Sequence, residues 1–141
     1  MYNKLMTCVA SVREKIDFKP EVALILGSGL GDYADEIKIV DTIEYTEIEG
    51  FPVSTVKGHK GRFVFGYVEE TPVVIMQGRV HYYEGYPMSD VVLPTRLMGM
   101  LGAKKILLTN AAGGVNDTYK PGDFMLITDH ITTGVPSPLI G

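Results

Sequence analysis

The chain has 141 residues, of which 45% are hydrophobic and 21% charged, and this is the composition of a globular domain with its own core. A net charge of −4 and an isoelectric point near 5.3 argue against nucleic acid or an anionic membrane as the main partner, because both favour a basic surface. A single cysteine, Cys8, cannot form an internal disulfide, which favours the reducing cytoplasm. A small-molecule ligand is therefore the expected partner.

The first half of the chain predicts a helix followed by strands. Residues 5–16 place apolar side chains at helical spacing, without the uninterrupted apolar core of a secretory signal, and no later run approaches the roughly 18 apolar residues of a membrane span. VALIL (22–26) is predicted to be a buried strand. Residues 37–45 and 62–68 predict strands with one solvated face, and 72–78 predicts a buried strand. We expect these three to be consecutive neighbours in a sheet.

The second half continues the alternation of helix and strand. Pro87 opens a helical pattern that Gly102 ends, and Pro94 within it is expected to bend or delay the helix. Residues 104–110 and 123–131 predict two more buried strands. The predicted fold class is α/β, with a mixed, twisted sheet flanked by helices and one domain over residues 1–141. Because the last ten residues are loop-like and follow a strand with nothing to cover it, we expect the chain to be part of a larger domain.

Glycines gather where the predicted strands end, and GSGLG (27–31) is the first such cluster. In this class of sheet, ligands bind beyond the carboxyl ends of the strands, and glycine lets backbone N–H groups approach an anion. The spacing fits neither the dinucleotide fingerprint, whose third glycine is replaced by Asp32, nor a phosphate-binding P-loop. Taken alone, the turn fits a tight turn with a solvated Ser28 better than an anion site.

GRVHYYEGY (78–86) is the stretch that points most directly to a site. In an extended segment, Arg79, His81 and Tyr83 would face the same way, whereas Val80, Tyr82 and Glu84 would face the other. A guanidinium fork and an imidazole N–H are suitable donors for a phosphate. An edge strand with a polar face is the structural alternative, but such an edge needs neither the arginine nor the histidine.

Three other features carry weaker signals. His59 lies between two glycines, where a solvated loop histidine is the simpler interpretation and a movable lid an alternative. TNAAGG (109–114) ends a predicted strand in small residues, which fits either close approach of a ligand or an ordinary strand end. Asp129 and His130 are adjacent and would face opposite ways on a strand, which favours a structural role. The histidines are far apart, and no metal-binding motif occurs, so no metal site is expected.

Taken together, these clusters resemble the trimeric family of purine nucleoside phosphorylases. The matching stretches occur in order: GSGLG (27–31), GHKGRFVFG (58–66), MQGRVHYYEGYP (76–87) and TNAAGG (109–114), with GDFMLITDHI (122–131) behind them. Each is a modest signal, but the ordered set is specific and spans nearly the whole chain.

The resemblance implies an activity and a set of site residues. The reaction would be phosphorolysis of purine (deoxy)ribonucleosides such as inosine or guanosine, which gives the free base and (deoxy)ribose 1-phosphate. Ser28, Arg79, His81 and the backbone at Ala111 would bind phosphate, with Arg79 and His81 as catalytic residues. His59 would lie over the phosphate end, and Tyr83 against the ribose. The resemblance further implies a cytoplasmic homotrimer of full-length chains in purine salvage, with phosphate as co-substrate and no metal or organic cofactor.

One departure and two alternatives accompany this resemblance. The family residues that hold the purine lie in the second half of its chains, beyond the last residue here, so the sequence corresponds to the amino-terminal part of such an enzyme. A methylthioadenosine phosphorylase would share the phosphate chemistry, although the amino-acid sequence of residues 78–87 is closer to that of the purine nucleoside enzymes. A non-catalytic phosphate- or nucleotide-binding module is the second alternative, whereas the broken glycine spacing disfavours a dinucleotide-dependent oxidoreductase.

Overall fold

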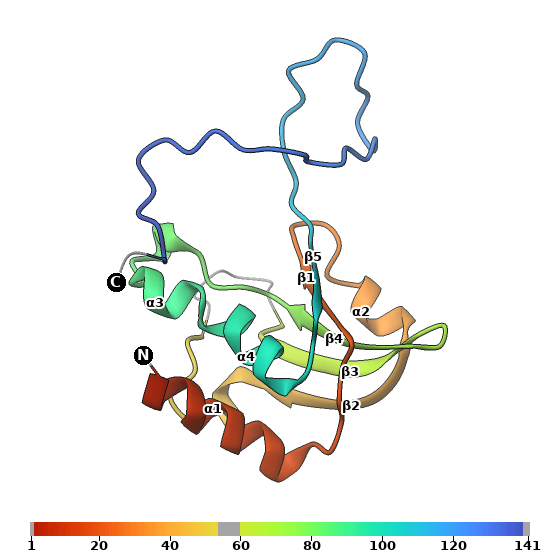
Figure 1. The fold of residues 1–141 in the computed structure, drawn as a ribbon. Coiled ribbons are helices and arrows are strands. Elements are labelled where there is room, and N and C mark those ends of the chain that lie inside the picture. Colours follow the sequence, from red (N-terminus) through yellow and green to blue (C-terminus); the bar gives the residue numbers. More distant parts are fainter. Residues whose placement is uncertain (1, 54–59, 140–141) are drawn as a thin grey trace.

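The computed structural model describes residues 2–53 and 60–139, and these form a mixed α/β structure (Figure 1). The helices are α1 (Tyr2–Lys15), α2 (Tyr33–Glu36), α3 (Met88–Val91) and α4 (Leu93–Leu101), with 3₁₀ turns η1 (Tyr45–Glu47) and η2 (Tyr82–Glu84). The strands are β1 (Val22–Leu26), β2 (Lys38–Glu44), β3 (Arg62–Val68), β4 (Thr71–Gln77) and β5 (Lys105–Leu108).

The strands form one five-stranded sheet in the order β2-β3-β4-β1-β5. β2, β3 and β4 are antiparallel neighbours, as the sequence predicts for consecutive strands, whereas β1 is parallel to both β4 and β5. The predicted mixed α/β class is therefore confirmed. Because β1, β4 and β5 are parallel, their carboxyl ends meet at one edge of the sheet.

Helices cover both faces of the sheet, and the alternation of side chains along the strands explains why. Phe63 and Phe65 of β3 belong to a core cluster that also contains residues of α1 and α4, while Val64 between them belongs to a second cluster with Ala34 of α2. Successive strand residues point to opposite faces, so β3 contributes to both clusters. The first cluster contains the buried Leu5, Cys8 and Val12 of α1 and Leu97, Met98 and Leu101 of α4.

The helical pattern after Pro87 is divided as the prolines predict. α3 ends at Val91, and α4 begins at Leu93 with Pro94 in its first turn, where its missing N–H leaves no hydrogen bond unmade. Gly102 follows α4 with φ of 130°, a conformation that glycine adopts readily.

Two predicted buried strands differ from what the structure shows. β5 forms beside β1, but Ile106, Leu107 and Leu108 are 43%, 53% and 61% exposed, so β5 is an exposed edge strand rather than a buried one. Residues 123–131 are not a strand; they belong to the irregular, exposed segment 109–139, which runs away from the sheet and returns towards α3 (Figure 1). The apolar pattern is compatible with a strand, but a strand needs a partner for its N–H and C=O groups, and this segment pairs with none.

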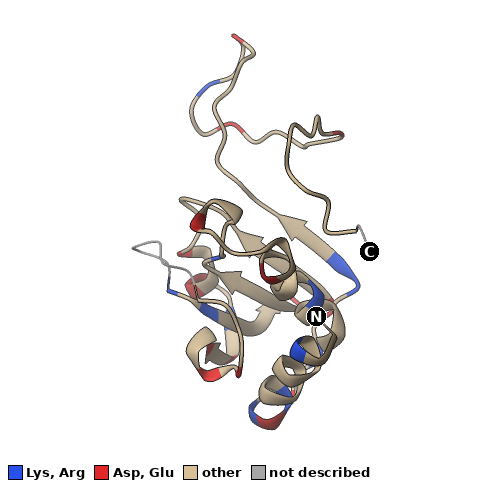
Figure 2. Ribbon diagram, turned by 90° about the vertical axis from the view of Figure 1, so that its left-hand side faces the viewer, with Lys and Arg blue, Asp and Glu red and all other residues tan. Residues whose placement is uncertain are grey.

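Helix α1 and the irregular segment 109–139 each carry charged residues of both signs (Figure 2). No helix among residues 2–53 and 60–139 is long and apolar enough to cross a membrane.

Candidate active site

The carboxyl ends of three parallel strands lie level with one another. Leu26 at the end of β1 pairs with Gln77 at the end of β4, and Ile25 pairs with Leu108 at the end of β5. The segments that begin at Gly27, Gly78 and Thr109 therefore leave the sheet at the same edge. Ligands of open α/β sheets bind in this position.

The glycine turn after β1 packs directly against the end of β5. The Gly27 N–H donates to Oγ1 of Thr109 at 2.8 Å, and a Cβ atom on Gly27 would lie 2.4 Å from the carbonyl oxygen of Thr109. Only glycine permits this approach. Ser28 follows and is exposed, and Gly29 has φ of 84°, so the turn presents the serine hydroxyl at the open end of the sheet.

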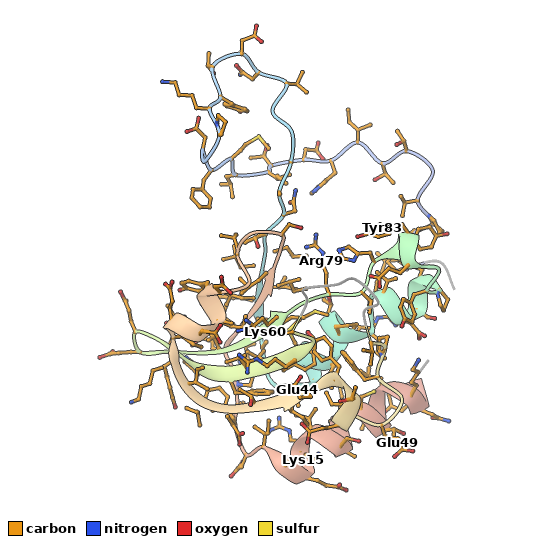
Figure 3. The ribbon with its side chains drawn as sticks, turned by 180° about the vertical axis from the view of Figure 1, so that it is seen from behind. Lys15, Glu44, Glu49, Lys60, Arg79 and Tyr83 are labelled. Atoms are coloured by element: carbon orange, nitrogen blue, oxygen red, sulfur yellow. The ribbon has the colours of Figure 1, made fainter. Side chains whose placement is uncertain are left out.

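Arg79 links the ends of β4 and β5. Its Nη1 donates to the carbonyl oxygen of Thr109 at 3.0 Å, and its Nε donates to Nε2 of His81 at 3.3 Å. Figure 3 shows Arg79 and Tyr83 at the end of the sheet from which the irregular segment leaves. The guanidinium thus lies at the carboxyl ends of β4 and β5, the edge of the sheet to which the glycine turn after β1 also belongs.

His81 is oriented by partners on both ring nitrogens. Arginine can only donate, so Nε2 of His81 accepts from Arg79, and Nδ1 carries the proton that it donates to Glu84 Oε1 at 2.8 Å. The same carboxylate oxygen accepts from the His81 backbone N–H at 2.7 Å, and the Glu84 side chain is only 3% exposed. The Tyr83 ring stacks on the imidazole with centroids 4.7 Å apart. Glu84 therefore fixes the plane of the imidazole.

The structure brings Arg79, His81 and Tyr83 together, although not by the predicted alternation of an extended strand. β4 ends at Gln77, and residues 82–84 form the 3₁₀ turn η2, which Gly85 ends with φ of 88°. The expectation that Glu84 faces away from His81 is wrong, because the 3₁₀ turn places residues three apart on one side. The spacing of a histidine and a glutamate three residues apart, as in a capping box, is the signal that could have found this pair.

Tyr45 fixes the start of the Arg79 segment from inside the core. Its hydroxyl donates to the carbonyl oxygen of Gly78 at 2.6 Å, and its ring packs edge-on against Phe63. Burial raises the pKa of Tyr45 well above its ordinary value, with a smaller contribution from the negative charge of Glu44. The hydroxyl is therefore protonated near neutral pH, where it donates to Gly78.

The other residues predicted for the site are Ala111 and His59, and the Asp129–His130 pair was considered beside them. Ala111 lies two residues beyond Thr109 and is exposed. His59 lies outside the described residues. The Asp129 carboxylate accepts the backbone N–H of His130 at 2.8 Å, a local contact in an exposed segment. Two residues that the sequence did not single out contact these segments. Thr109 accepts hydrogen bonds from Gly27 and Arg79, and Gln77 donates to the carbonyl oxygen of Gly31.

A surface hollow of about 310 Å³ lies elsewhere, lined by Lys19, Pro20, Glu21, Gly102, Lys104 and Lys105. These residues precede β1 and β5 or, in the case of Lys105, begin β5, so the hollow is at the amino ends of the strands, opposite the candidate site. Among the described residues, no group of three or more histidine, cysteine, aspartate or glutamate side chains is placed to hold a metal ion.

Comparison with known proteins identifies the family. Residues 21–141 match the family model of the phosphorylase superfamily, so the chain belongs to this superfamily. It is 52% identical over 130 residues to purine nucleoside phosphorylase 1 of Geobacillus stearothermophilus, covering 92% of this chain and 47% of that protein. It is 45% identical to purine nucleoside phosphorylase of Mus musculus, covering 92% of this chain and 45% of that protein.

Solved structures give the same result. A crystal structure of purine nucleoside phosphorylase in complex with ribose-1-phosphate matches with a TM-score of 0.80 and 43% identity, over 86% of this chain and 44% of that chain. The Schistosoma mansoni enzyme in complex with inosine matches with a TM-score of 0.77 and 41% identity, over 86% of this chain and 42% of that chain. The resemblance to purine nucleoside phosphorylases is thus confirmed, and the chain spans about half the length of the relatives that it matches.

Proposed function

We propose that this chain supplies the phosphate side and part of the ribose side of a purine nucleoside phosphorylase. The observation that carries the proposal is the convergence of Ser28, Arg79 and His81 at the carboxyl ends of β1 and β4, with Arg79 bonded across to Thr109 after β5. The Ser28 hydroxyl after β1 and the Arg79 guanidinium after β4 are suitable donors for a phosphate dianion, and the His81 imidazole adds a donor N–H when both of its nitrogens carry a proton.

Phosphorolysis needs little more from this half of the site than placement of charge. A phosphate oxygen forms a bond to the anomeric carbon while the bond from that carbon to the purine nitrogen breaks, and the electron pair leaves with the purine, which takes up a proton. The sugar becomes oxocarbenium-like, and the phosphate anion beside it is both stabilising charge and nucleophile. Fixed placement of the reactants can lower such a barrier by about 7–11 kcal/mol at best.

Each site residue has a role in this proposal. Ser28 and the backbone at Ala111 bind phosphate, Arg79 and His81 bind and orient it, and His59 lies over it. The exposed ring of Tyr83, stacked on His81, packs against the ribose. Phosphate is a co-substrate, and no metal or organic cofactor takes part. We further propose that the full-length enzyme is a cytoplasmic homotrimer of purine salvage.

Inosine cleavage by the chain, measured with and without inorganic phosphate, tests the activity. Phosphate-dependent release of hypoxanthine supports the proposal, and faster cleavage of methylthioadenosine would favour the related phosphorylase instead. Inosine cleavage by a longer form of the protein but not by this chain would show that this part lacks the purine side of the site. Phosphate binding with no cleavage of either nucleoside by either form would favour a non-catalytic phosphate-binding module.

The Arg79→Ala variant tests the assigned site. It is expected to weaken phosphate binding about 10- to 100-fold, because hydrogen bonds to a charged group are among the stronger ones. Arg96→Ala is the matched control, since Arg96 lies on α4 and donates to the carbonyl oxygen of Pro138. Unchanged phosphate affinity in Arg79→Ala would remove Arg79 from the site.

A further inference from the structure

Gln77, the last residue of β4, is a buried polar side chain next to the candidate site. It is 2% exposed, as a whole residue. A primary amide at this depth needs partners for both its oxygen and its nitrogen, because an unsatisfied buried polar group is costly. Its partners show what it holds together.

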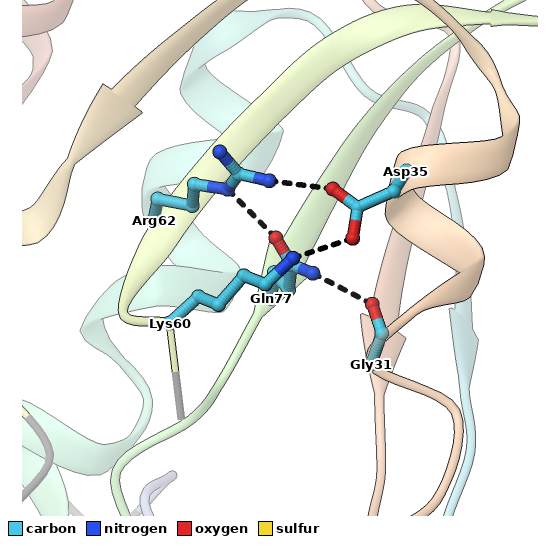
Figure 4. Close-up of polar contacts among 5 residues, drawn as sticks. All are labelled: Gly31, Asp35, Lys60, Arg62 and Gln77. Carbon is cyan, nitrogen blue, oxygen red and sulfur yellow. Dashed lines mark hydrogen bonds and ion pairs between the residues drawn. The ribbon is translucent and has the colours of Figure 1, made fainter. Parts of the chain in front are cut away.

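The two ends of the Gln77 amide bind different parts of the chain. Oε1 accepts from Nε of Arg62 at 2.7 Å, and Nε2 donates to the carbonyl oxygen of Gly31 at 2.7 Å (Figure 4). The orientation of the amide is fixed, since a guanidinium can only donate and a carbonyl oxygen can only accept. Gly31 is the last residue of the glycine turn that contains Ser28.

A carboxylate closes the network on its other side. Asp35 lies on α2, directly after the glycine turn, and its Oδ1 accepts from Nη2 of Arg62 at 2.7 Å, while its other oxygen forms an ion pair with Lys60 (Figure 4). The Lys60 hydrogen bond lowers the pKa of Asp35, assisted by the charges of Lys60 and Arg62. The turn is thus held at Gly31 by Gln77 and just beyond it by Arg62 and Lys60.

We propose that Gln77 is a positioning residue that fixes the glycine turn of residues 27–31 relative to Arg79. Gln77 is joined to Arg79 through Gly78 alone, and its amide is bonded to the turn. It therefore sets the spacing between the Ser28 hydroxyl and the Arg79 guanidinium without touching the phosphate. This inference deepens the proposed function and rests on it.

Gln77→Glu is the most direct test. Glutamate keeps the size of the side chain and the acceptor for Arg62, but it cannot donate to Gly31 and sets a carboxylate oxygen against the Gly31 carbonyl oxygen. We expect the Kd for inorganic phosphate, measured by titration calorimetry, to rise about 10- to 100-fold, as small displacements in a preorganised site do. Where inosine turns over, the KM for phosphate should rise while the KM for inosine changes little.

Two further variants separate positioning from general stability. Ile75→Val changes a fully buried residue of β4 on the same face as Gln77, so it disturbs the strand without touching the network and should leave the phosphate Kd unchanged. Asp35→Asn changes the network at a partly exposed side chain. It therefore provides a second test if the Gln77→Glu variant does not fold. It should raise the phosphate Kd several-fold, because Arg62 and Lys60 lose a charged partner.

The outcomes are distinguishable. If the wild-type chain binds phosphate and both network variants bind it equally well, Gln77 has no positioning role, and the proposed function stands. An equal loss of affinity in Ile75→Val would also overturn the inference. If the wild-type chain binds no inorganic phosphate, the proposed phosphate site itself is wrong, and the inference falls with it.

Discussion

The contact between Gly27 and Thr109 shows how strongly a single residue restricts the candidate site. The backbones of the two segments are so close that a methyl group on Gly27 would meet three backbone atoms of residues 109 and 110 within 3 Å. A side chain there would push the β1 turn away from β5. The glycine therefore brings together the two segments that carry Ser28 and the acceptor for Arg79.

Gly27→Ala is expected to lower the free energy of unfolding by about 1–3 kcal/mol, because the clash is with backbone that cannot move aside cheaply. Gly31→Ala in the same turn is the matched control, since a Cβ at Gly31 has nothing within 4 Å. Urea unfolding of both variants measures the difference. Equal stabilities would show that the two strand ends are not held as closely as described.

Tyr45 permits a second prediction at this scale, in which pH is the variable. Tyr45→Phe leaves the buried Gly78 carbonyl oxygen without its donor and should lower the free energy of unfolding by about 1–3 kcal/mol near neutral pH. Because burial raises the pKa of Tyr45 above its ordinary value of 10.0, the unfolded chain releases the proton first as the pH rises. The advantage of wild type should therefore be complete below about pH 10 and shrink above it.

Urea unfolding at a neutral and an alkaline pH measures both effects. Tyr33→Phe is the control, because Tyr33 is partly exposed and its hydroxyl should contribute little. An advantage of wild type that stayed constant into the alkaline range would mean that Tyr45 ionises as readily when folded as when unfolded.

Among the elements, β5 differs from the strands beside it. β1 and β4 have neighbours on both sides, and their central residues are buried, whereas β5 pairs only with β1 and exposes its apolar side chains. An edge strand with little packing opens at low free energy. The candidate site thus depends on one well-packed strand pair, β1 and β4, and on one strand with little packing, β5.

Hydrogen exchange should reveal this difference directly. The backbone amides of β5 and of residues 109–139 are expected to exchange much faster than those of β3 and β4, because they lack buried neighbours. Exchange followed by mass spectrometry resolves these segments. Protection in residues 105–108 equal to that in β4 would contradict the exposure described for β5.

At the scale of the whole molecule, large apolar side chains are exposed in one continuous part of the chain. β5 and the irregular segment expose Ile106, Leu107, Leu108, Val115, Phe124, Met125, Leu126, Ile127 and Ile131. So many exposed apolar side chains are unusual for an isolated monomer and favour contact with other protein surface.

The chain is therefore expected to associate as its concentration rises, which light scattering after size-exclusion chromatography measures. Replacing both Phe124 and Leu126, which are 90% and 86% exposed, by serine should lower the apparent mass at high concentration. Tyr2→Ser is the control, because Tyr2 is exposed on α1 outside this part of the chain. Association unaffected by the double variant would assign it to another surface.

Local pattern determined most of the elements of this protein. The apolar spacing of α1, the runs of β1 and β4, and the break between α3 and α4 follow from side-chain periodicity and proline chemistry. The ordered motifs also indicated the superfamily. These features depend on a few neighbouring residues, which is why the sequence alone was sufficient for them.

Tertiary contacts decided the rest, because a pattern of apolar residues states a tendency to be buried and not the partner that buries it. Residues 123–131 have the pattern of a strand but no neighbour to pair with, and β5 has a neighbour on one side only. The bond from His81 to Glu84 required a 3₁₀ turn where alternation had predicted extended chain. The network of Gly31, Asp35, Arg62 and Gln77 joins residues up to 46 positions apart, and only the folded sheet brings them into contact.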